Sequence, residues 1–289
     1  MDFSESDSVE AVLASFADTP DPRLHEIVDS LVRHLHGFLR EVRPSIAEWE
    51  QGIEFLTAIG QKCDEHRQEY ILFSDVLGAS MLVETMEAAR QAADATASTV
   101  LGPFHVVASP ERELGDSIDT LGTGEACLIE GTVTGPEGEA VPGARIDIWQ
   151  ADEQGSYDVE SDRQPLGNGR GLFTADDEGR YWFRSIVPAH YPIPTDGPVG
   201  ALLNATRRHP YRPAHVHVIV EAPGYVPVTT HVFVEGSEYL DSDAVFAVKQ
   251  SLVRDFAPSD DPETATRLGL PNPFRRARFD VVLAPAASS

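Results

Sequence analysis

The chain has 289 residues, 42% of them hydrophobic and 24% charged, which is typical of a globular protein. Its formal net charge of −25 excludes nucleic acid and anionic membrane surfaces as expected partners, because like charges repel. Two cysteines, an acidic N-terminus without an apolar leader and the lack of a run of about 20 apolar residues favour a cytoplasmic protein without membrane spans.

The first third of the chain predicts amphipathic helices. Apolar residues recur at steps of three and four over residues 22–42, and Asp21 is suited to cap that helix. A second helix is expected after Ser45, because a glutamate stands three residues further on, as in a capping box. A third is expected to begin near Asp64 and to run into an alanine-rich tail at 88–97.

From about residue 99, glycine and proline become frequent and apolar residues alternate with polar ones, which is typical of short strands joined by turns. Strands are expected at 126–135, 142–150 and 277–285, hairpins at 171–186 and 212–236, and a short helix at 241–256, capped by Asp241 or Asp243. Many short strands indicate a β-sandwich. The predicted fold class is α+β, with an N-terminal helical domain and linker at 1–98 followed by an antiparallel β-sandwich at 99–289.

Two histidines stand out in the stretch RPAHVHVIVE, residues 212–221, where the apolar residues predict a buried strand. Residues two apart on a strand point to the same face. His215 and His217 are therefore expected to aim together, with Cα atoms about 6.5–7 Å apart. That spacing suits a shared metal ion.

Two alternatives use the same part of the chain. The spacing His-x-His-x-x-x-Glu is half of a cupin metal motif, in which Glu221 and His231 would join His215 and His217 around Fe(II) or Zn²⁺. The glycines that flank the cupin motif are missing, and a cupin gives no reason for the helical first part. Residues 131–149 resemble transthyretin-like and Ig-like extension domains, which predicts a non-enzymatic binding module but leaves the histidines without a role.

Two tyrosines complete a larger pattern. Tyr157 stands in GSYD, just past a strand end, and Tyr191 in HYPIPTDGPVG, a loop whose prolines restrict the backbone. GSYD, HYPIPTDGPVG and RPAHVH, in this order, resemble the intradiol ring-cleavage dioxygenases, as do STVLGPFHV and GARIDIWQ before them. The resemblance covers nearly all of residues 20–285. It implies one Fe(III) per subunit, held by Tyr157, Tyr191, His215 and His217.

The donor types agree with that chemistry. Free tyrosine has a pKa of about 10, and a trivalent cation strongly favours its ionised form, a hard donor suited to Fe(III). Two histidines and one carboxylate would instead suit Fe(II). The resemblance further implies that Arg212 stabilises negative charge on the substrate ring, and that Tyr191 is released as substrate binds and accepts a proton.

The segments GRYWFRSI, YPIP and THVFVEGSEYLDSDAVF resemble the hydroxyquinol branch of the family more than the catechol branch. The expected reaction is cleavage of hydroxyquinol by O₂ to maleylacetate, and the alternative is cleavage of catechol or chlorocatechol to cis,cis-muconates. The branch implies the following substrate contacts: Leu72, Asp75, Val100, Leu101, Gly102, Pro103, Phe104, Ile193, Pro194, His231 and Val245.

Asp75 is the expected substrate contact that would distinguish hydroxyquinol from catechol. A carboxylate in an apolar pocket can accept a hydrogen bond from a third ring hydroxyl, which plain catechol lacks. The alternative is that Asp75 caps or stabilises its own helix. The family resemblance also implies that the sandwich is the catalytic domain, and that the protein forms a homodimer through its N-terminal helices, around a bound phospholipid.

Overall fold

The computed structural model describes residues 3–64, 67–90, 94–102, 104–105, 108–160 and 162–286, so Pro103, one of the expected substrate contacts, lies outside the described residues. The chain divides into two compact units, Met1–Ala58 and Ile59–Ser289. This division falls earlier in the chain than the boundary expected between residues 98 and 99. The roles assigned to the two predicted domains stay predictions.

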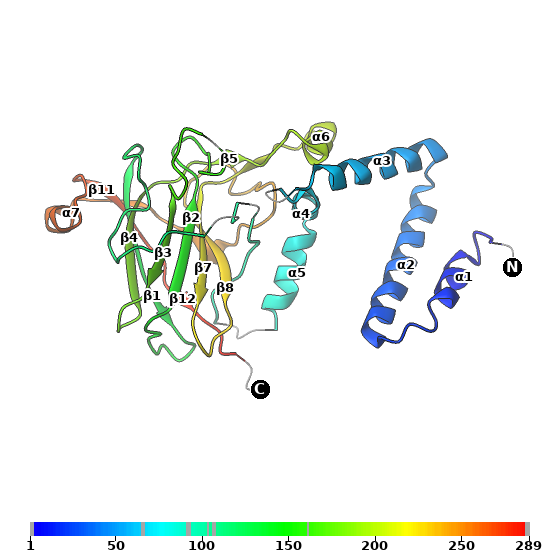
Figure 1. The fold of residues 1–289 in the computed structure, drawn as a ribbon, viewed down its shortest axis with the longest axis horizontal. Coiled ribbons are helices and arrows are strands. Elements are labelled where there is room, and N and C mark those ends of the chain that lie inside the picture. Colours follow the sequence, from blue (N-terminus) through cyan, green and yellow to red (C-terminus); the bar gives the residue numbers. More distant parts are fainter. Residues whose placement is uncertain are drawn as a thin grey trace. The chain divides into compact units, whose positions relative to one another are not determined.

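The first unit is helical. It contains α1 (Ser8–Ser15), α2 (Pro22–Val42) and most of α3 (Ile46–Lys62), coloured blue in Figure 1. The carboxylate of Asp21 accepts hydrogen bonds from the backbone N–H groups of Arg23 and Leu24, at 2.8 and 3.1 Å. Ser45 and Glu48 form a capping box, because the Ser45 N–H donates to the Glu48 carboxylate and the Glu48 N–H donates to the Ser45 hydroxyl. Both predicted helix starts are confirmed.

The third predicted helix is instead two helices, α4 (Glu69–Val76) and α5 (Ala79–Ala88). Gly78 lies between them with a φ of 73°, a left-handed conformation that interrupts the helix. The expectation of one continuous helix is therefore wrong. Residues 91–93 of the alanine-rich tail lie outside the described residues. Within the described ranges, no helix combines the length and the apolar character needed to cross a membrane.

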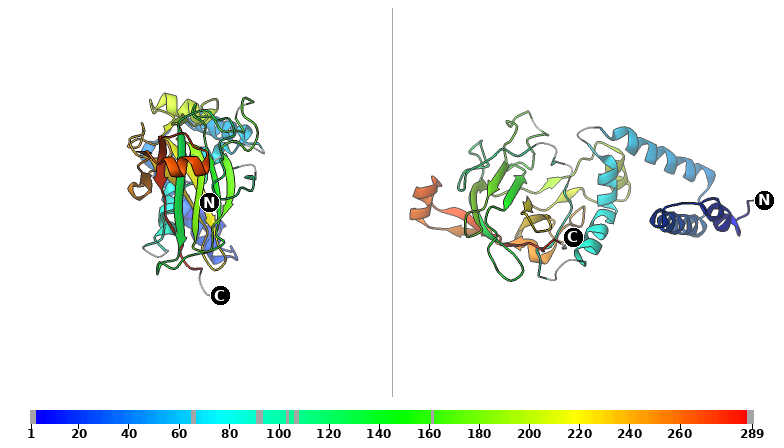
Figure 2. Two further views of the ribbon diagram at one scale, coloured as in Figure 1. Left: turned by 90° about the vertical axis from the view of Figure 1, so that its left-hand side faces the viewer. Right: turned by 60° about the horizontal axis from the view of Figure 1, so that its bottom comes forward.

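The second unit is built on two sheets that lie face to face and a two-stranded ribbon (Figures 1 and 2). The strands are β1 (Ala126–Thr134), β2 (Arg145–Gln150), β3 (Arg170–Thr174), β4 (Arg180–Ile186), β5 (Tyr191–Pro192), β6 (Tyr211–Arg212), β7 (His215–Glu221), β8 (Val228–Val234), β9 (Val253–Arg254), β10 (Ala257–Ser259), β11 (Phe274–Arg278) and β12 (Val281–Val282). One sheet has the order β10-β11-β1-β12, with β4 also paired to β1, and the other has the order β3-β2-β7-β8-β9. The ribbon pairs β5 with β6.

The α+β class and the sandwich are thus confirmed, but the sandwich is not purely antiparallel. Strand β1 runs parallel to β11 and β12, and β8 runs parallel to β9. Helix α6 (Pro198–Ala205) lies beside α4 on one side of the sheets, whereas α7 (Pro262–Leu268) lies at the far edge, next to β11 (Figure 1).

Of the two predicted hairpins, one is confirmed and one is wrong. Strands β7 and β8 pair in antiparallel register, as expected. Strands β3 and β4 do not pair with each other, since β3 pairs with β2 and β4 with β1 in the opposite sheet. The reason is core packing: Phe173 and Phe183 are fully buried and stack across the two sheets, with ring centroids 5.1 Å apart.

The helix expected at 241–256 is also wrong, because the structure has only the short 3-10 helix η1 (Gln250–Leu252) there. The Asp243 carboxylate accepts hydrogen bonds from the N–H groups of Val245 and Ala247, at 3.3 and 3.0 Å. It therefore caps a turn, as its residue type allows, but no helix follows.

Candidate metal centre

Strand β7 presents His215 and His217 on one face, as expected. Each is 1% exposed, and their Nε2 atoms lie 3.1 Å apart. The His215 Nδ1 atom lies 2.7 Å from the carbonyl oxygen of Pro213, so the ring donates there and its Nε2 atom keeps a lone pair for a metal. Across the sheet, His217 is in register with Trp149 on β2 and with His231 on β8.

The His217 ring is fixed by stacking and by a glycine. It lies 4.6 Å from the Trp149 ring with an interplanar angle of 9°. Gly102 lies on another side, with a φ of 78°, and a Cβ atom built there would stand 3.0 Å from the His217 ring. A larger residue at this predicted contact would therefore push against the histidine.

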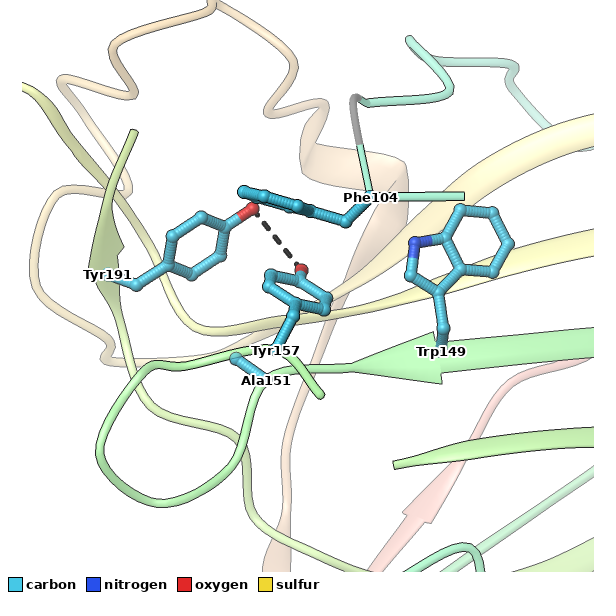
Figure 3. Close-up of a cluster of buried hydrophobic side chains, with 5 residues drawn as sticks. All are labelled: Phe104, Trp149, Ala151, Tyr157 and Tyr191. Carbon is cyan, nitrogen blue, oxygen red and sulfur yellow. Dashed lines mark hydrogen bonds between the residues drawn. The ribbon is translucent and has the colours of Figure 1, made fainter. Parts of the chain in front are cut away.

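A loop and a short strand, far apart in the sequence, bring the tyrosines together, as Figure 3 shows. Tyr157 follows β2 and Tyr191 begins β5, and the Tyr157 hydroxyl donates to the Tyr191 oxygen over 3.2 Å. The two segments approach closely at Gly155, where an added Cβ atom would stand 2.8 Å from the Tyr191 Cβ atom. Phe104 stacks on the Tyr157 ring at 4.5 Å. Both tyrosines are at most 3% exposed.

Four donor atoms consequently form one chain of short contacts: from the Tyr157 oxygen to the Tyr191 oxygen, 3.2 Å; on to His215 Nε2, 3.4 Å; and on to His217 Nε2, 3.1 Å. Neighbouring ligands of one metal ion, each about 2 Å from it, stand at similar separations. The arrangement therefore suits a single ion surrounded by two phenol oxygens and two imidazole nitrogens.

The cupin-like set is not assembled. Among the described residues, the His, Cys, Asp and Glu side chains close enough to share a metal ion are His215, His217 and His231. Glu221 is exposed and lies in register with Arg145 at the other end of β7. A carboxylate ligand from Glu221 is thus contradicted.

The protonation of the site follows from its burial. Burial holds the pKa of His215 and His217 well below the ordinary value, with the Arg212 charge lowering both further and the His231 and His215 rings contributing at His217. Both rings are therefore neutral, as metal ligands require. Burial also raises the pKa of Tyr157 and Tyr191, with the neighbouring tyrosine adding to the effect at Tyr157 and Arg212 opposing it at Tyr191.

Arg212 lies at the edge of the donor atoms. Its guanidinium is held by Asp243, with Nε 3.1 Å from Oδ1. Its Nη1 atom lies 3.2 Å from His215 Nε2 and 3.4 Å from His231 Nε2. Burial opposes the charge, but Asp243 and the two tyrosines outweigh burial and raise the pKa of Arg212. A permanent cation is therefore fixed beside the candidate metal site.

His231 uses both of its ring nitrogens. The Nε2 atom faces Arg212, and the Nδ1 atom contacts the hydroxyl of Thr99. The ring is fully buried and 4.2 Å from that of His217. These contacts make His231 a support for Arg212, next to the donor atoms.

Asp75 is the most unusual of the expected substrate contacts. It is 2% exposed, and its Oδ1 atom has no hydrogen-bond partner within the described part of the chain. Burial raises the pKa of its carboxyl, while Ser80 and Arg212 lower it and Asp243 raises it. An unpaired buried acceptor of this kind can recognise a donor on a ligand.

The remaining expected contacts differ in exposure. The buried ones are Leu72, Val100, Phe104, Ile193 and Val245. Pro194 is partly exposed, and Leu101 is 44% exposed, so Leu101 is not part of the buried set.

Sequence reasoning missed several supporting residues. Asp243 was considered only as a helix cap, and Trp149 only as part of a strand motif. Arg170 and Asp158 form an ion pair 2.7 Å apart with side chains 1% exposed, and Arg170 also donates to the carbonyl of Phe104 over 2.9 Å. Nothing in one sequence links Arg170 to Asp158, whereas the alternation of β2 could have placed Trp149 on the histidine face.

Comparisons with known proteins extend over nearly the whole chain. The family model described as "Dioxygenase" matches residues 102–285, and the one described as "Catechol dioxygenase N terminus" matches residues 21–95. A hydroxyquinol 1,2-dioxygenase from a Rhizobium species is 49% identical over 284 residues, which cover 98% of this chain and 96% of the relative.

Two solved structures agree with the fold. A hydroxyquinol 1,2-dioxygenase from Pseudomonas putida has a TM-score of 0.90 and 44% identity, over 98% of this chain and 99% of that one. A catechol 1,2-dioxygenase from Acinetobacter radioresistens has a TM-score of 0.86 and 30% identity, over 99% of this chain and 94% of that one.

Proposed function

Because the chain belongs to the family of intradiol ring-cleavage dioxygenases, we propose that it opens the ring of hydroxyquinol, 1,2,4-trihydroxybenzene, between the carbons that carry the 1- and 2-hydroxyls. Both atoms of O₂ enter the product, 3-hydroxy-cis,cis-muconate, which is the enol form of maleylacetate. The observation that carries the proposal is the convergence of two tyrosine oxygens and two histidine nitrogens within 3.1 to 3.4 Å of one another along the chain of contacts.

We propose that these four side chains, Tyr157, Tyr191, His215 and His217, hold one Fe(III) per subunit. The donor set fits that ion, since phenolate oxygen is hard, the imidazoles are neutral, and no carboxylate belongs to the group of described residues that could share an ion. Bound there, a ferric ion supplies the Lewis acidity that withdraws electron density from a deprotonated diol.

The protein's own residues then have separable tasks. The Tyr191 oxygen lies between the Tyr157 oxygen and His215 Nε2, where it is placed to accept a proton from a substrate hydroxyl. Arg212, held by Asp243, stabilises negative charge that develops on the ring. The burial of all these groups excludes water, which strengthens each electrostatic interaction.

The unpaired Asp75 oxygen favours hydroxyquinol over the alternative substrates, catechol and chlorocatechols, which would give cis,cis-muconates. Hydroxyquinol carries a third hydroxyl that can donate to Oδ1, whereas catechol would leave that acceptor unsatisfied. The higher identity to hydroxyquinol enzymes than to the catechol enzyme supports the same choice.

The predicted homodimer and phospholipid belong to this proposal as well. Apolar side chains of α2 are exposed, among them Leu31 by 61% and Phe38 by 58%, which supports a partner surface. In the same unit a hollow of about 600 Å³ is lined by apolar Ile46 and Trp49 together with Arg40 and Arg43, among others, which suits an acyl chain with an anionic head. Native mass spectrometry tests both the dimer and the bound phospholipid.

The cytoplasmic location stays a prediction.

Oxygen consumption tests the reaction. The iron-loaded protein is supplied with hydroxyquinol, catechol or a chlorocatechol under ¹⁸O₂, and the product mass is measured. We expect the highest kcat/KM with hydroxyquinol and two labelled oxygen atoms in the product. Oxygen uptake with no ring-opened product, or uptake only with catechols, contradicts the proposal.

A further inference from the structure

Arg208 bridges two segments of the second unit. It follows α6 and is partly buried. Its Nη1 atom donates to the carbonyl oxygen of Val76, the last residue of α4, over 2.5 Å, and its Nη2 atom donates to the carbonyl oxygen of Ala244 over 3.0 Å. One guanidinium therefore fixes the distance between the end of α4 and the segment around residue 244.

These two segments carry the proposed substrate-recognising groups. Val76 directly follows Asp75, and Ala244 stands between Asp243 and Val245. Asp75 and Val245 are both buried, and Asp75 lies within electrostatic range of Asp243. The bridge thus joins the residue that would meet the third hydroxyl to the segment that holds Arg212.

The residue type suits this task. Carbonyl groups in the last turn of a helix lack partners within the helix and carry partial negative charge, so a cation that donates to them is favourable. Arginine offers several N–H donors in a rigid plane, whereas lysine offers one ammonium group on a flexible stem. Arginine therefore holds two divergent carbonyls at a fixed separation better than lysine does.

A second contact joins the same two segments. The Arg208 guanidinium lies over the Phe246 ring, 5.1 Å from its centroid, and a Cβ atom added at Gly78 would stand 3.4 Å from that ring. Phe246 is 52% exposed and has a φ of 61°, a conformation uncommon outside glycine. The strain indicates that the segment is held in place by its contacts.

We propose that Arg208 is a positioning residue that sets substrate specificity, by holding α4 and the 243–247 segment at the separation at which Asp75 Oδ1 meets the third hydroxyl of hydroxyquinol. This inference rests on the proposed function. The described contacts of Arg208 involve none of the four donor residues and not Arg212. Asp243 holds Arg212 and accepts hydrogen bonds from Val245 and Ala247 independently of Arg208. Loss of Arg208 is therefore expected to weaken recognition of the third hydroxyl and to leave the ring-opening chemistry in place.

The test compares Arg208→Met and Arg208→Lys with Arg207→Met, a control that removes the same charge from the exposed neighbouring residue. Dissociation constants for hydroxyquinol and catechol are measured without O₂, from the change in the visible absorption of the iron-loaded protein, and kcat and KM are measured with O₂. For Arg208→Met we expect hydroxyquinol to bind about tenfold more weakly, roughly the loss of one hydrogen bond to a charged acceptor, with kcat and catechol binding little changed.

Arg208→Lys is expected to lose a smaller part of the preference, and Arg207→Met none. An unchanged hydroxyquinol-to-catechol affinity ratio in Arg208→Met overturns the inference, as does an equal loss for both substrates. If Arg208→Met does not fold, an unchanged ratio in folded Arg208→Lys overturns it instead. Failure of the wild-type protein to consume O₂ with hydroxyquinol contradicts the proposed function and is thereby distinguished from failure of this inference.

Discussion

Arg212 and Asp243 form a buried ion pair, with Arg212 Nε 3.1 Å from Asp243 Oδ1 and side chains that are 3% and 1% exposed. The same carboxylate accepts hydrogen bonds from the backbone of Val245 and Ala247. One side chain thus orients the proposed catalytic cation and shapes the segment that lines the proposed substrate pocket.

Removal of this carboxylate charge should be costly. Asp243→Asn leaves Arg212 as a buried, unpaired cation, so we expect the free energy of unfolding to fall by about 3 kcal/mol. Urea denaturation measures the change, and Asp241→Asn, at an exposed position two residues earlier, is the control. Equal small effects of the two substitutions would show that the ion pair contributes little.

His231 is expected to support Arg212 without binding the metal. Both of its ring nitrogens have other partners, Arg212 and Thr99. We therefore expect His231→Gln to retain one iron per subunit while kcat falls about tenfold, because Arg212 keeps Asp243 but loses its second support. His215→Gln should lose iron. The iron content of both variants, measured by metal analysis, tests this role. Equal iron loss in the two variants would show that His231 is a ligand.

Asp75 should lower stability at neutral pH in return for specificity. Burial raises the pKa of its carboxyl above the ordinary value of 3.8, so in the window between the unfolded and folded values the folded state binds more protons than the unfolded state. Stability from this group is then complete below about 3.8 and is lost as pH rises through the folded pKa.

The neutral amide of Asp75→Asn does not titrate. We expect this variant to be more stable than the wild type by about 1 kcal/mol at pH 7, with the difference shrinking as pH falls, and to prefer hydroxyquinol over catechol less strongly. Denaturation at several pH values together with substrate kinetics checks both parts. A stability difference that does not vary with pH would contradict the account.

Iron loading should release protons from the tyrosines. Burial raises the pKa of Tyr157 and Tyr191, so both are protonated before a cation binds, while the neutral histidines contribute no protons. In weakly buffered solution, the wild-type protein should release about one proton more per iron than Tyr157→Phe does. Protons released by hydrolysis of the iron salt are the same for both proteins, so they drop out of the comparison. Equal proton release would remove Tyr157 from the ligand set.

Local signals in the sequence were sufficient for part of the fold. The cap at Asp21 and the capping box at Ser45 depend on residues a few positions apart, and both helix starts are confirmed. The expected hairpin at 171–186 is wrong, because β3 pairs with β2 and β4 pairs with β1 in the other sheet. Phe173 on β3 and Phe183 on β4 instead stack across the two sheets, a contact that no local sequence pattern specifies.

Some residues of the candidate site were also predictable from the sequence, and others were not. Strand alternation placed His215 and His217 on one face, and the family pattern supplied Tyr157 and Tyr191, all of which the structure brings together. Asp243 was interpreted as a helix cap because its distant partner, Arg212, is invisible to local reasoning. A buried charge acquires its partner through tertiary packing, so its role follows only from the folded chain.

Tyr157 and Tyr191 are proposed to bind a ferric ion as tyrosinates, and visible absorption of the iron-loaded protein tests this assignment most directly. Tyrosinate bound to Fe(III) absorbs visible light, so the protein should be red-brown. The band should weaken in Tyr157→Phe and in Tyr191→Phe and disappear in the double variant. A colourless wild-type protein with one iron per subunit, or a band that survives in the double variant, would contradict the assignment of Tyr157 and Tyr191.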